Sequence, residues 1–148
     1  MSITDRIVLM RSGVIQQVGE AHEIYMDPNN SFVASFMGNP PITFIDVAVR
    51  EKSVVLPDGT ALAFPDAPEG RCRMGIRPEA WTPGKTVGVR LDQVEMRGQD
   101  QVVGFDLGGT HITATLDAEY EAAPGKEVWF DIRPSRCYFF DPETGKRL

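Results

Sequence analysis

The fold class is decided by one stretch of sequence, Arg71-Cys72-Arg73-Met74-Gly75-Ile76-Arg77-Pro78-Glu79. Cys72 stands between two arginines, and such an alternation predicts a strand that turns one face to the core. We therefore expect Cys72 to be buried in a strand over residues 72–77. The strand ends at an Arg-Pro pair, and Pro78 is well placed to begin a one-turn helix because proline is favoured at the first helical position.

The same period of two continues on both sides of this stretch. Further candidate strands cover residues 45–50, 54–56, 61–64, 86–96, 102–107, 111–116, 128–132 and 137–140. Turns rich in Gly and Pro separate them, among them Thr82-Pro83-Gly84 and Gly108-Gly109, and Gly88 inside a strand indicates a bend. Many short strands with regular turns predict a mainly β fold, a small barrel or barrels of antiparallel strands, or a sandwich.

The first part of the chain has a different pattern. Residues 5–19 predict a hairpin whose turn contains Gly13. A short helix over 21–26 follows and ends before a proline, and Asn29 or Asn30 caps a second helix that ends near a glycine. The change from helical spacing to a period of two places a boundary close to residue 40. The expected units are 1–40 and 41–148.

Composition excludes several classes of function. The net charge is −6 and the sequence holds no basic block, so we expect no nucleic-acid partner. Cys72 and Cys137 lie too far apart in sequence for a CxxC metal site or a disulfide framework, which favours a reducing, cytoplasmic setting. No stretch of the sequence approaches the roughly 18 apolar residues that a membrane span needs, and its first residues do not have the pattern of a signal peptide. We therefore expect any membrane association to be through a partner.

Residue patterns typical of catalysis are missing from the sequence. It contains no G-x-x-x-x-G-K-[ST] phosphate loop and no G-x-G-x-x-G. Gly108-Gly109 precedes a strand rather than a helix, so a hairpin turn is the favoured role. His22 and His111 are expected to be surface residues rather than metal ligands. We therefore assign no catalytic, cofactor-binding or metal-binding residue.

An internal echo concerns two arginines. Ile76-Arg77-Pro78-Glu79 recurs as Ile132-Arg133-Pro134-Ser135, which either two related barrels or chance would explain. Each arginine could pair with a phosphate or carboxylate, or could bond carbonyls at a strand end or a local acid. We favour the structural role for both, and Arg77, Glu79 and Arg133 remain the candidates for ligand or interface contacts.

Several motifs together resemble the end of an ABC ATPase domain and the linker and C-terminal domain that follow it. The stretches that carry the resemblance are Asp5–Met10, Gly13–Gly19, Glu23–Tyr25, Asp27-Pro28, Phe32–Gly38, Pro41–Phe44, Gly75–Glu79 and Phe140–Leu148. More narrowly, the chain resembles the C-terminal, TOBE/OB-type segment of carbohydrate-importer ATP-binding subunits of the maltose and glycerol-phosphate type. The likeness implies a remnant of the ATPase domain over 1–40 and a regulatory TOBE domain over 41–148.

The resemblance implies a function by contact. In this family the domain helps two ATPase subunits to dimerise, docks regulatory proteins and stays cytoplasmic against the permease. The phosphate loop, signature motif, catalytic acid and switch histidine of the family would lie upstream of Ile3, so ATP and Mg²⁺ belong to the parent protein and this chain is not expected to be an enzyme. The alternative is a small-ligand or oxyanion sensor, and a single-strand nucleic-acid binder is disfavoured by the acidic charge.

Overall fold

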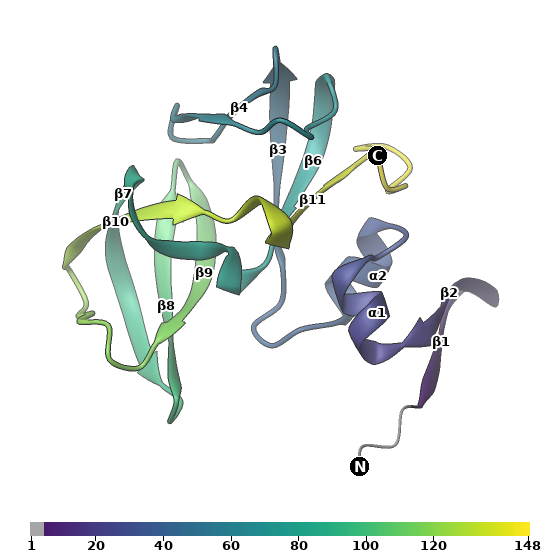
Figure 1. The fold of residues 1–148 in the computed structure, drawn as a ribbon, viewed down its shortest axis with the longest axis horizontal. Coiled ribbons are helices and arrows are strands. Elements are labelled where there is room, and N and C mark those ends of the chain that lie inside the picture. The colour runs from purple at the N-terminus through teal and green to yellow at the C-terminus, as the bar shows by residue number, and fades with distance from the viewer. Residues whose placement is uncertain (1–4) are drawn as a thin grey trace.

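The computed structural model describes residues 5–148, so residues 1–4 of the expected unit 1–40 lie outside the described residues. Figure 1 shows a hairpin and two short helices beside a larger β body, with the C-terminus returning to the helices. The helical unit contains β1 (Arg6–Arg11), β2 (Val14–Glu20), α1 (Ala21–Met26) and α2 (Ser31–Phe36). These elements confirm the expected hairpin and pair of helices.

Local chemistry fixes each end of this unit. Ser12 and Gly13 both have positive φ, 52° and 80°, which suits the tight turn between β1 and β2. The side chain of Asn30 accepts a hydrogen bond of 2.9 Å from the backbone N–H of Val33 and so caps α2. The hairpin buries Leu9 against the helices, while its other face leaves apolar side chains exposed. These exposed side chains are Val8, Met10, Ile15 and Val18.

The β body consists of two antiparallel sheets. One has the order β11-β6-β3-β4-β5 and the other the order β10-β7-β8-β9. The strands are β3 (Thr43–Arg50), β4 (Ser53–Val55), β5 (Ala61–Ala63), β6 (Gly70–Ile76), β7 (Trp81–Met96), β8 (Asp100–Leu107), β9 (Thr110–Asp117), β10 (Glu127–Ile132) and β11 (Cys137–Phe140). The expected mainly β, OB-like architecture is confirmed, and Gly108-Gly109 forms the expected turn between β8 and β9.

The expectation of an inter-strand turn at Thr82-Pro83-Gly84 is wrong, because these residues belong to β7. Pro83 pairs with Phe130, and the next pair joins Gly88 to Trp129, so residues 84–87 bulge out of the ladder. The Asp131 carboxylate organises this bulge. It accepts hydrogen bonds from the Thr86 hydroxyl at 2.7 Å and from two backbone N–H groups at 3.1 Å each. Thr82-Pro83-Gly84 therefore do lead into a local bend of the chain, but this bend lies inside strand β7.

The repeated Ile-Arg-Pro sequence lies where the chain crosses between the sheets. Two one-turn helices, η1 (Pro78–Ala80) and η2 (Pro134–Arg136), join β6 to β7 and β10 to β11. The crossings lie side by side and exchange backbone hydrogen bonds reciprocally. The Arg77 N–H donates to the Arg136 carbonyl at 3.0 Å, and the Arg133 N–H donates to the Ala80 carbonyl at 2.7 Å. The echo thus corresponds to one paired crossing rather than to two separate cores.

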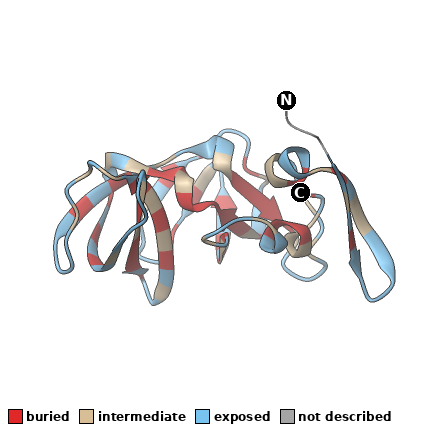
Figure 2. Ribbon diagram, turned by 90° about the horizontal axis from the view of Figure 1, so that it is seen from below, coloured by how far each residue is buried: buried red, intermediate tan, exposed pale blue. Residues whose placement is uncertain are grey.

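A single buried core extends across both sheets. Trp81, Phe105 and Phe130 pack with ring centroids 5.1 to 5.9 Å apart, and Phe64 contacts Phe139 edge to face. Figure 2 shows buried residues concentrated along the facing strands of the β body. Burial of each such ring contributes about 1.5–3 kcal/mol, so these rings add substantially to the stability of the β body. Cys72 is buried, as expected.

Candidate functional site

The helical unit packs on the outer face of the five-stranded sheet beside β11. A buried cluster there combines Ala34 and Ile42 with Tyr138 and Phe140, and Phe44 packs against it. A Cβ atom at Gly75 would lie 2.8 Å from Ile42 Cδ1 and 3.2 Å from the Phe140 ring. The absence of a side chain at Gly75 therefore lets Ile42 and Phe140 pack closely against the backbone of β6.

Arg77 connects the two parts directly. Its side chain is fully buried, and its guanidinium donates to the carbonyl oxygens of Ala34 at 3.0 Å, Met37 at 2.8 Å and Tyr25 at 3.0 Å. These carbonyls lie at the C-terminal ends of α1 and α2, where helices leave acceptors without internal partners. The guanidinium also stacks 4.0 Å from the centroid of the Tyr25 ring. Arg77 thus bonds carbonyls as expected, although they are those of helix ends.

Glu79 completes this network from the other side of Pro78. The Tyr25 hydroxyl donates a short hydrogen bond to Glu79, and Arg136 Nε lies 3.6 Å from the same carboxylate oxygen. Burial, reinforced by the neighbouring Glu79 carboxylate, raises the pKa of the Tyr25 phenol far above its usual value. The phenol therefore stays protonated as a permanent hydrogen-bond donor to Glu79.

The C-terminal segment adds a second connection. Gly145 O accepts from the Ser31 N–H at 2.9 Å, and the Arg147 N–H donates to Asn29 O at 3.1 Å. The Arg147 guanidinium bonds Asp27 at 2.9 Å and lies 4.8 Å from the centroid of the Tyr138 ring. We call the contacts of Arg77, Glu79 and Arg147 with the helical unit the joint.

Arg133 has a different environment from Arg77. It is exposed, and within residues 5–148 its side chain makes no hydrogen bond or ion pair. The structural role expected for both arginine side chains is therefore found for Arg77 and is wrong for Arg133, and the repeat corresponds only in the backbone of the crossing. Sequence reasoning missed Tyr25 and Arg147 as members of the joint, because their partners lie 54 and 120 residues away in the chain.

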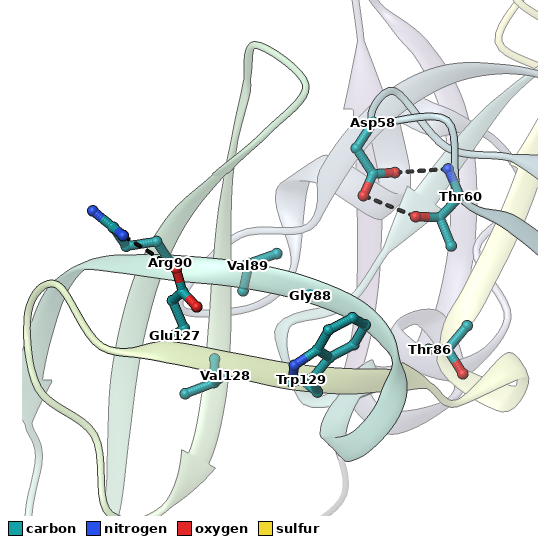
Figure 3. A pocket seen from close by; sticks show the side chains of 9 residues that line it. All are labelled: Asp58, Thr60, Thr86, Gly88, Val89, Arg90, Glu127, Val128 and Trp129. Atoms are coloured by element: carbon teal, nitrogen blue, oxygen red, sulfur yellow. Dashed lines mark hydrogen bonds and ion pairs between the residues drawn. The ribbon is translucent and has the colours of Figure 1, made fainter.

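A groove of about 550 Å³ lies between the β4–β5 loop and the outer face of β7 and β10. Figure 3 shows the Trp129 indole over β7 at Gly88, with the Arg90–Glu127 ion pair on one side and Thr86 on the other. Asp58 and Thr60 form the opposite wall, joined by a hydrogen bond of 2.8 Å between their side chains. Sequence reasoning did not single out Trp129.

Other kinds of site are not found in the part of the chain that the structure describes. Over residues 5–148, no three His, Cys, Asp or Glu side chains gather in a way that could hold a metal ion. His22 and His111 are exposed, as expected. Within the same range, no helix has the length and apolar character that crossing a membrane requires.

The chain is similar to known proteins over its whole length. A family model described as a TOBE domain matches residues 74–140. The sn-glycerol-3-phosphate import ATP-binding protein UgpC of Chromobacterium violaceum is 35% identical over 158 residues, which cover 100% of this chain and 43% of that protein. The sulfoquinovosyl glycerol transport ATP-binding protein SmoE of Agrobacterium fabrum is 32% identical over 160 residues, 100% of this chain and 45% of that protein. The chain thus spans less than half the length of these curated relatives.

Proposed function

Because residues 74–140 form a TOBE domain, we propose that this chain is the accessory and regulatory part of the ATP-binding subunit of a bacterial sugar-type ABC importer. Its similarity to import ATP-binding proteins extends over 100% of the chain, helical unit included, which supports a common role for both parts. ATP and Mg²⁺ would be bound by a separate domain of the parent protein.

The observation that carries the proposal is the joint. The helical unit resembles the end of an ATPase domain, and Arg77, Glu79 and Arg147 fix it to the β body through buried or partly buried polar contacts. A connection of this kind transmits a displacement of one part to the other, because closely packed interiors deform little. We infer that the β body follows the motion of the ATPase domain and offers contact surfaces that move with it.

The partners follow from this role. The proposed partners are a second copy of the chain, the ATPase domain of the parent protein, the transporter permease and a regulatory protein. The site of action would then be the cytoplasmic face of the membrane, reached through the permease. The β-body contacts would hold two subunits together while the ATPase domains open and close.

Sedimentation equilibrium tests the dimer. The purified chain should show a concentration-dependent equilibrium between monomer and dimer. Since the hairpin exposes Val8 and Ile15, a Val8→Thr/Ile15→Thr variant serves as control for association through that face. A dimer that persists in this variant supports contact through the β body. A strict monomer, or a dimer abolished by the double substitution, contradicts dimerisation by this domain.

An ATPase assay tests the assignment of catalysis to a separate domain. The purified chain should give background phosphate release with Mg²⁺ and ATP. ATP turnover that co-purifies with the chain through two different columns would refute the assignment of catalysis to a separate domain.

A further inference from the structure

The groove beside Trp129 combines an exposed aromatic surface with polar groups on all sides. The indole covers Gly88, where a Cβ atom would lie 3.0 Å from the ring, and this accounts for the aromatic residue opposite the glycine. Trp129 is nevertheless 56% exposed. An exposed indole is unusual for a residue whose role is packing alone, because tryptophan is highly buried on average. Part of its surface is thus free to contact a ligand.

The polar groups around the indole form three pairs. The Thr86 hydroxyl donates to Asp131 at 2.7 Å, and Arg90 donates to Glu127 at 3.1 Å. Both pairs join β7 to β10 on the face that carries Trp129, one on either side of it. Because side chains on one strand face repeat every second residue, each pair lies about 7 Å from the indole along the strands. The third pair, Asp58 with Thr60, faces them from the β4–β5 loop.

The chemistry of these pairs selects the class of ligand. The Thr86–Asp131 and Asp58–Thr60 pairs present acceptor oxygens, because each threonine proton is already donated within its pair, and Arg90 beside Glu127 adds N–H donors. Acceptors with a few donors among them match hydroxyl groups, since a hydroxyl both donates and accepts. The lining carries two carboxylates, Asp58 and Glu127, against one guanidinium, Arg90, and is therefore unfavourable for an anion. Recognition of a quaternary ammonium usually uses several aromatic rings, and Trp129 is the single aromatic residue in the lining.

We propose that this groove binds an uncharged hexopyranose ring stacked on Trp129. Such a ring has an apolar face of C–H groups to lie on the indole and hydroxyl groups around its rim to meet the three polar pairs. The proposal is independent of the joint, which lies on other residues. It also differs from an oxyanion sensor, because the two carboxylates and one guanidinium in the lining disfavour an anion.

Ligand-observed NMR provides the test, with methyl α-D-glucopyranoside and maltose as probes. Saturation transfer from the protein to the sugar C–H groups should be saturable, with half-saturation on the order of 1 mM for a ligand of this size in an open groove. Trp129→Ala should abolish the transfer. Met96→Ala is the matched control, because Met96 is 60% exposed on the same strand β7 but outside the groove, and it should leave the transfer unchanged.

A second variant separates loss of binding from loss of folding. Asp58→Ala acts from the opposite wall and leaves Trp129 in place, and it should weaken binding about tenfold through the lost charged hydrogen-bond partner. Emission from the buried Trp81 reports on the fold in every variant. Absence of saturable transfer with both sugars, transfer that survives Trp129→Ala, or stronger binding of sulfate or adenosine than of either sugar would each overturn the proposal.

Discussion

Replacing Arg77 by Met should separate the helical unit from the β body. Methionine keeps much of the apolar volume but removes all three hydrogen bonds to the carbonyls of Tyr25, Ala34 and Met37. A hydrogen bond from a charged donor is worth about 1.5–3 kcal/mol, so simple addition gives an upper bound of about 4.5–9 kcal/mol. The actual loss should be smaller for two structural reasons.

First, two of the three hydrogen bonds are only part-buried, so water can reach those carbonyls after the substitution. Second, Arg77 Nε is buried without a hydrogen-bond partner, and Met removes that unfavourable group. We therefore expect a loss of about 2–6 kcal/mol, from about 1–3 kcal/mol for the buried Ala34 carbonyl left without a partner and about 0.5–1.5 kcal/mol for each of the other two hydrogen bonds. This is a large share of the roughly 5–15 kcal/mol that stabilises a domain.

Urea unfolding followed by circular dichroism and by fluorescence of the buried Trp81 measures this loss. Hydrogen exchange then locates it: protection should fall most for the backbone of α1 and α2 and least for β8 and β9. Arg133→Met is the matched control, since Arg133 occupies the same place in the repeated motif but is exposed, and it should change stability by less than about 0.5 kcal/mol. Equal effects of the two substitutions, or a uniform loss of protection, would refute the role given to Arg77.

Three further predictions concern packing, pH and reactivity. Gly75→Ala should destabilise the chain by about 1–3 kcal/mol in urea unfolding, because its Cβ would collide with Ile42; an unchanged midpoint would contradict the close approach. Hydrogen bonds from the Thr86 side chain and the Lys85 backbone lower the pKa of Asp131 below its usual value, so its contribution to stability is present above about pH 4 and is lost as the pH falls through the folded-state pKa. Asp131→Asn should flatten the fall in unfolding free energy below pH 4, and an unchanged slope would contradict this. Burial raises the pKa of the Cys137 thiol to about 12, so a thiol reagent at pH 8 should label it only in urea; rapid labelling of the native protein would show that the site is open.

The fold was largely predictable because its signals are local. Alternation located nine strands in the β body, and Gly13 marked a turn that the structure contains. The sequence offered Asn29 or Asn30 as the cap of the second helix, and the structure selects Asn30. The strand β7 was predicted too short, since Thr82-Pro83-Gly84 has the composition of a turn and only the distant Asp131 carboxylate explains why the strand continues beyond it.

The joint and the groove were harder to predict for the same physical reason. The sequence singled out Arg77 and Glu79, but whether an arginine meets a ligand or a helix end depends on what folds against it. Arg133 illustrates this, because an almost identical local sequence leaves it exposed. Trp129 lies in a strand whose residues alternate between buried and exposed, as in an ordinary edge strand. Its position over Gly88 depends on the pairing of β10 with β7, which the local sequence does not reveal.

The paired crossing of η1 and η2 has a consequence for modularity. The chain leaves the five-stranded sheet after Ile76 and returns to it at Cys137, and these two residues are register partners in neighbouring strands. The four-stranded sheet is therefore topologically an insertion, whose two ends meet in space at the reciprocal hydrogen bonds of Arg77 and Arg133. Segments with adjoining ends tolerate exchange and changes of length better than segments that span a domain. The four-stranded sheet, with its groove, can thus diversify between proteins while the β6–β11 pair and the joint stay unchanged.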